Sequence, residues 1–139
     1  MDIMSKAPPK QVPTGNQLKY LNSREMGRLA VAEKGGMPHV TPIIYAMDGV
    51  YPVIATDYGT KKLKILIQNN KASLLVDDVN PNKGVMIQGT VEIFERGKEY
   101  IRLLKVLFDR LEYYRENPWG EGESPLLRIT PEHVSAWGV

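Results

Sequence analysis

The chain has 139 residues, of which 42% are hydrophobic and 24% are charged, and its net charge at neutral pH is +2. These values are typical of one globular domain and argue against general binding to nucleic acid or to anionic membranes. The chain has no cysteine, which excludes disulfides and cysteine-ligated metals, and it has neither an apolar signal segment nor the ~18-residue apolar run of a membrane-spanning helix, so we expect a cytoplasmic protein with no membrane partner.

Turn residues and apolar patterns predict the elements of the first half. Residues 1–15 are polar and contain three prolines, so we expect a mobile N-terminal arm or an extended strap, followed by a single domain over residues 16–139. The first element of this domain is a short helix within residues 16–26. Three strands then follow over residues 29–32, 40–47 and 51–56, joined by hairpin turns at residues 34–36 and 48–49.

The second half continues with helices and strands. We expect a short helix over residues 61–68, strands over 72–76 and 85–94, and a late strand, single or divided, over 126–129 and 134–137. The clearest helix spans residues 97–115, where Ile101, Leu104, Phe108 and Leu111 recur at helical spacing. Because hairpins join most of the strands, we predict a mainly β fold, an antiparallel six-stranded barrel accompanied by α-helices.

The junction between the third strand and the following helix has the chemistry of a phosphate-binding site. The first N–H groups of a helix lack partners within it and carry a partial positive charge. Thr56 and Thr60 add hydroxyl groups, Lys61 and Lys62 add positive charge, and Gly59 allows a tight turn. The alternative is an ordinary junction capped by Thr60, with the lysines as a solvated face, and the local pattern leaves both interpretations open.

Six segments, in this order, resemble the FMN-binding split-barrel family typified by pyridoxamine 5'-phosphate oxidases. One has the glycine-x-proline-x-x-x-proline pattern. Another is similar to the family segment tyrosine-threonine-asparagine-tyrosine-x-serine-arginine-lysine, which grips the flavin phosphate. The matching segments are residues 27–30, 36–42, 55–62, 70–76, 88–91 and 131–137. The resemblance covers residues 28–137 and implies an FMN-binding split barrel.

The resemblance also implies a cofactor, a partner and a site. FMN would lie at the interface of a homodimer, its phosphate neutralised by Lys61 and Lys62 and its ring beside the second strand. The flavin would carry hydride transfer to or from a small molecule, so an oxidoreductase of this kind needs no catalytic side chain. The residues implied to bind the cofactor are Thr41, Pro42, Ile43, Ile44, Tyr45, Ala55, Thr56, Thr60, Lys61, Lys62, Gln88 and Trp137.

The chain departs from the oxidase in ways that leave the chemistry open. Val40 and Tyr45 occupy the positions of two basic residues of the oxidase, Gly84 replaces a glutamine, and the C-terminal arginine segment has no counterpart. The resemblance therefore indicates a small flavoprotein rather than the oxidase itself.

Three alternatives remain at this point. A deazaflavin, whose longer acidic tail would use Lys64 and Arg28, would keep the fold. Heme would need His39 or His133 as an axial ligand. A third alternative is a module that binds flavin, senses redox state or binds a partner without catalysis.

Two further groups of residues bear on ligands. Two histidines without cysteines or a carboxylate cluster make a poor metal site, so we expect no metal. Tyr113, Tyr114 and Trp119 cluster after the long helix, and from the sequence they either line a substrate pocket or bury against a partner chain.

Overall fold

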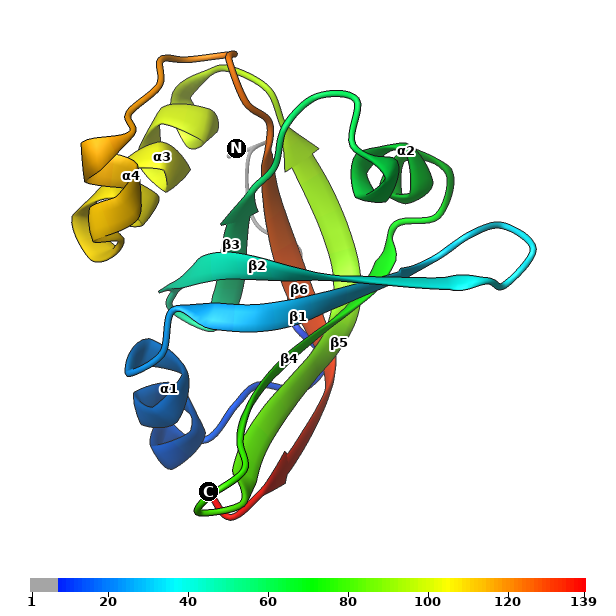
Figure 1. Cartoon of the computed structure of the whole chain (residues 1–139), viewed down its shortest axis with the longest axis vertical. Helices are drawn as coiled ribbons and strands as arrows, with labels where there is room; N and C mark the ends of the chain where they lie inside the picture. The colour runs from blue at the N-terminus through cyan, green and yellow to red at the C-terminus, as the bar shows by residue number, and fades with distance from the viewer. Residues whose placement is uncertain (1–7) are drawn as a thin grey trace.

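The computed structural model describes residues 8–139 (Figure 1). In this part of the chain six antiparallel strands close into one barrel in the order β1-β2-β3-β6-β5-β4, which confirms the predicted fold class. The strands are β1 (Met26–Ala32), β2 (Pro38–Asp48), β3 (Tyr51–Ala55), β4 (Lys71–Asp78), β5 (Lys83–Phe94) and β6 (Leu126–Trp137). The helices are α1 (Gly15–Asn22), α2 (Lys61–Gln68), α3 (Lys98–Arg110) and α4 (Glu112–Glu116).

The helices lie around the barrel rather than on one face of it. In Figure 1, α3 and α4 lie together on one side, α2 lies on the other side beside β5, and α1 lies near the lower end. The β1–β2 hairpin extends past the barrel as an arm next to α2, and the C-terminus lies at the end opposite α2. Among the described helices, none is long and apolar enough to cross a membrane.

The alternation of the strands produces two apolar cores. Side chains of one face, such as Leu29, Leu74 and Ile87, are fully buried inside the barrel. Side chains of the other face, such as Val53, pack beneath α3 against Leu103 and its neighbours. The second core fixes α3, and the loops that follow it, against the outside of the barrel.

The buried side of α3 agrees only in part with the predicted one. Tyr100, Leu103 and Leu107 are the buried residues of the helix, and the predicted residue Leu111 is buried directly after it, whereas the predicted core residue Ile101 is 52% exposed. The segment has two apolar stripes of the same period, offset by one residue. In the buried stripe the Tyr100 hydroxyl donates to the Ser124 carbonyl at 2.6 Å. The single helix expected over residues 97–115 also breaks at Leu111, whose backbone is extended.

The N-terminal region contains a helix and, before it, a segment that contacts β6. The helix expected within residues 16–26 spans Gly15–Asn22 and begins with a capping box, in which Thr14 and Gln17 accept each other's backbone N–H groups. Before it, the Lys10 N–H donates to the Pro131 carbonyl at 3.0 Å, and Gln11 accepts from the Val134 N–H at 2.9 Å. Within the expected arm, Lys10 and Gln11 therefore contact β6, and residues 1–7 lie outside the described part.

Gly89 is required where β5 and β6 slip in register. A β-bulge lies between Gln88 and Gly89, and a Cβ at Gly89 would lie 1.9 Å from the Thr130 carbonyl oxygen. We expect Gly89→Ala to lower the free energy of unfolding by at least about 2 kcal/mol, because backbone must move to admit the methyl group. Gly35→Ala is the matched control, since a Cβ there meets nothing within 4 Å. Urea unfolding measures both variants, and equal losses would contradict this interpretation.

A buried arginine joins α3 to the barrel. The side chain of Arg128 is 1% exposed, and its guanidinium donates to Glu99 at 2.5 Å and to Glu92 at 3.1 Å. It also lies over the Phe94 ring at 4.7 Å. Glu99 accepts a second bond from Arg102, which in turn pairs with Asp48 at the β2–β3 turn. The network joins segments that are distant in the sequence, so no local pattern predicts it.

The network makes stability depend on pH. Hydrogen bonds from Arg102, and then from Arg128, lower the pKa of Glu99 below its ordinary value of 4.5, although burial opposes this. The unfolded chain therefore takes up a proton at Glu99 before the folded protein does, and the stability that Glu99 contributes is lost as the pH falls below about 4.5. We expect Glu99→Gln to unfold with a shallower pH dependence in that range, measured by urea unfolding at successive pH values. An unchanged slope would contradict this.

Candidate functional site

The junction between β3 and α2 is held in shape by two threonines. Thr60 caps α2: its hydroxyl accepts from the Leu63 N–H at 3.4 Å and donates to the Asp57 carbonyl at 3.1 Å. The hydroxyl of Thr56, which is 7% exposed, lies 3.2 Å from that of Thr60. Gly59 has a φ of +82°, the left-handed conformation that glycine adopts without strain. The turn therefore brings both hydroxyls to the start of the helix.

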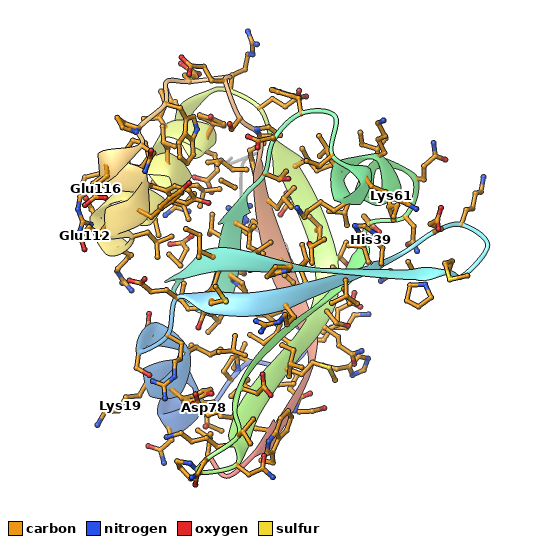
Figure 2. The ribbon with its side chains drawn as sticks, viewed as in Figure 1. Lys19, His39, Lys61, Asp78, Glu112 and Glu116 are labelled. Atoms are coloured by element: carbon orange, nitrogen blue, oxygen red, sulfur yellow. The ribbon has the colours of Figure 1, made fainter. Side chains whose placement is uncertain are left out.

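The same turn provides positive charge and free donors. A Thr60 cap satisfies the N–H of Leu63, which leaves the N–H groups of Lys61 and Lys62 without acceptors in the helix. The Lys61 ammonium is 3.9 Å from the Glu33 carboxylate on the arm, and its side chain is 60% exposed. Lys62 is half-buried. In Figure 2, Lys61 and His39 lie on the same side of the molecule, at α2 and at the base of the arm. These donors suit a phosphate monoester.

The five predicted residues of β2 do not share a face. Thr41, Ile43 and Tyr45 alternate with Pro42 and Ile44. Tyr45 is 1% exposed and its hydroxyl donates to the Leu21 carbonyl at 2.5 Å, so its side chain belongs to the core. Ile44 packs against the cluster beneath α3. The Thr41 hydroxyl is buried without a hydrogen-bond partner in the described part of the chain.

Gln88 lies in a groove on the outside of the barrel. Its amide donates to the Ser73 hydroxyl at 3.1 Å, and His133 is its register partner on β6. The groove has a volume of about 320 Å³ and borders the base of the arm at Ala32 and Pro38. Glu33 of the same arm pairs with Lys61 at the start of α2. The arm therefore borders both the groove and the junction between β3 and α2.

Trp137 is not brought to these residues within one chain. It is the last residue of β6, its indole N–H donates to Asn82 at 3.2 Å, and its ring covers Gly84. Figure 1 shows the nearby C-terminus at the end of the molecule opposite α2. The structure therefore brings together Ala55, Thr56, Thr60, Lys61 and Lys62, places Gln88 in the neighbouring groove, and leaves Trp137 apart.

The structure also shows a second cavity beside Thr56. The Thr56 N–H donates to the Pro125 carbonyl at 3.1 Å, which places the loop before β6 next to the junction. The resulting cavity of about 350 Å³ is lined by Thr56, Asp57, Tyr113, Tyr114 and Trp119 together with Ala55, Asn117 and Ser124. The sequence indicates the aromatic cluster, because its members are close together along the chain. It does not indicate that Asp57 lines the same cavity, because only the pairing of β3 with β6 brings Asp57 and the aromatic residues together.

Comparison with known proteins identifies the family. A family model described as pyridoxamine 5'-phosphate oxidase matches residues 14–138. The chain belongs to this family.

Three known proteins are similar to this chain. A 5a,11a-dehydrotetracycline/5a,11a-dehydrooxytetracycline reductase from Streptomyces rimosus is 26% identical over 135 residues, which cover 91% of this chain and 83% of the reductase. A FAD-binding protein from Mesorhizobium loti superposes with a TM-score of 0.72 at 21% identity, over 91% of this chain and 95% of its own. A heme-binding protein from Mycobacterium smegmatis superposes with a TM-score of 0.75 at 16% identity, over 91% of this chain and 55% of its own. The two structural similarities establish a shared fold.

The predicted absence of a metal site stays a prediction. Among the described residues, no group of three or more histidines and carboxylates could hold a metal ion. His39 and His133 lie on β2 and β6, and the chain has no cysteine to add to them.

Proposed function

We propose that this family member is an FMN-binding oxidoreductase that transfers hydride between its flavin and a small molecule. The observation that carries the proposal is the Thr60-capped start of α2, with the buried Thr56 hydroxyl, two helix N–H groups and two lysines at one turn. These donors suit a phosphate group. Membership of the family supports a flavin as the molecule that carries this phosphate. When bound, the flavin supplies the hydride chemistry, and the chain supplies binding and orientation.

In this proposal the flavin ring lies in the groove that contains Gln88. The groove adjoins the arm that contacts Lys61, and Gln88 offers an amide to a ring carbonyl or nitrogen. Tyr45 and Ile43 contribute only through the β2 backbone, because their side chains are buried in the core.

We propose further that the protein works as a homodimer with the flavin at the interface. The arm and β2 expose Met37 and Val40, which are 66% and 57% exposed, beside the groove. A second copy packed there would remove these side chains from water. In such a dimer, the flavin bound by one chain would be contacted by Trp137 of the other chain. Sedimentation velocity tests this, and a monomer at all concentrations would contradict it.

A cofactor with a longer anionic tail is the second candidate. Lys34 and Lys64 line a groove of about 340 Å³ with Lys61, so positive charge continues beyond the phosphate position. FAD or a deazaflavin would place further acidic groups there.

The test is the absorbance spectrum of the purified protein, followed by mass identification of whatever heat releases. A flavin spectrum with FMN released would support the proposal, whereas FAD or a deazaflavin would support the second candidate. Released heme, or a colourless protein that does not bind added flavin, would contradict both.

A further inference from the structure

We propose that the cavity between the junction and α4 binds an organic ammonium group, such as a methylated amine. The site is separate from the groove that contains Gln88 and requires no cofactor. Its walls come from three parts of the chain: Thr56 and Asp57 after β3, Tyr113 and Tyr114 on α4, and Trp119 in the following loop. Its volume of about 350 Å³ falls within the range of small-molecule sites.

The aromatic rings form a corner suited to a cation. The Tyr114 and Trp119 rings are 4.7 Å apart and nearly perpendicular at 88°, and the Tyr113 ring lies 5.7 Å from that of Tyr114. Rings set at an angle present more than one face to the same space, and ring faces attract ammonium groups. Trp119 is held in place because its indole N–H donates to the Tyr100 hydroxyl at 3.1 Å.

The charge of the lining also favours a cation. Asp57 contributes a carboxylate, and no lysine or arginine lines the cavity. Within the described residues no cation pairs with Asp57, and Arg115 of the same helix turns back to the Phe108 and Asp109 carbonyls. An ammonium ligand would therefore complete a charge pair that the chain leaves open.

The polar groups of the lining add hydrogen-bonding capacity. Among the described residues none hydrogen-bonds the Tyr114 hydroxyl, and burial raises its pKa to about 12, with smaller contributions from Tyr113 and Asp57. The hydroxyl therefore keeps its proton near neutral pH, and a ligand hydroxyl or amine finds both a donor and an acceptor there.

The experiment compares choline with its uncharged isostere, in which a carbon atom replaces the nitrogen. The protein is used as purified, and binding is followed by calorimetry and by the NMR signals of its two tryptophan indoles, assigned with Trp137→Phe. We expect choline to bind at least about tenfold more tightly than the isostere and to shift the Trp119 signal but not the Trp137 signal. Equal affinities, no saturable binding, or a shift confined to Trp137 would overturn the proposal.

Two variants locate the charge and the rings. Asp57→Asn keeps the shape and removes the carboxylate, and Tyr113→Leu removes a ring that is 62% exposed, so neither threatens the fold. We expect each to weaken choline binding about five- to tenfold while the isostere is unaffected. Asp109→Asn is the matched control, since that carboxylate lies on α3 and pairs with Lys105. Unchanged choline affinity in Asp57→Asn would contradict the site as assigned.

Discussion

Replacing Lys61 and Lys62 together with alanine is expected to raise the Kd for FMN by roughly 100-fold or more. Both lysines lie in the first turn of α2, where charge-assisted hydrogen bonds to phosphate contribute about 1.5–3 kcal/mol each. The Thr60 cap and the helix N–H groups remain, so residual binding through the ring should survive. The measurement is titration of cofactor-free protein with FMN, followed by flavin fluorescence.

The matched control replaces two lysines of another helix. Lys98 and Lys105 are exposed on α3, and Lys105 makes only a surface pair with Asp109. Lys98→Ala with Lys105→Ala makes the same change in net charge, so any general effect of charge on an anionic ligand appears in both proteins. Equal loss of affinity in the two double variants would place the phosphate elsewhere.

Replacing Arg128 with methionine is expected to lower the free energy of unfolding by about 3 kcal/mol. The change leaves Glu99 and Glu92 without the buried guanidinium that both contact, and removal of one partner from a buried pair costs about 3–5 kcal/mol. We expect the lower end of this energy range because Glu99 still pairs with Arg102 and because the Glu92 side chain is 42% exposed. Methionine fills much of the space over Phe94, so the lost polar contacts dominate the effect. Urea unfolding at neutral pH measures it.

Arg102→Met provides the comparison, since Arg102 contacts the same carboxylate from a side chain that is 42% exposed. Only the arginine end of these pairs is exposed, since Glu99 and Asp48 are each 13% exposed, but water can partly replace an arginine at the surface, so this variant should lose less stability than Arg128→Met. If Arg102→Met is as destabilised as Arg128→Met, burial does not set the strength of this network.

Local patterns predicted the strands and α2 well, because their signals are short-range. The junction is the clearest example: an apolar strand, a glycine with positive φ and a threonine cap lie within ten residues, and each acts on its immediate neighbours. The α2 boundaries at Lys61 and Gln68 agree with the sequence prediction for the same reason.

Features that depend on contacts between distant segments were not predictable in this way. The sequence pattern predicts a helix at α3 correctly. Which side of the helix is buried also involves the contact of Tyr100 with Ser124, which is 24 residues away in the sequence. The cavity beside Thr56 depends on the pairing of β3 with β6, and the burial of Arg128 depends on α3 covering that strand. Residues 41–45 of β2 are predicted to run beside the flavin ring as one segment, but the burial of the Tyr45 side chain against the Leu21 carbonyl depends on α1, which is distant in sequence.

The central claim is that the junction at Thr60 binds the phosphate of a flavin, and comparing FMN with riboflavin tests it most directly. The two ligands share a ring and a ribityl chain, and riboflavin lacks only the phosphate. We predict that the wild-type protein binds FMN roughly 100-fold more tightly than riboflavin, and that the variant with alanine at positions 61 and 62 loses most of this difference. Equal affinity of the wild-type protein for both ligands, or a difference that persists in the variant, would contradict the claim.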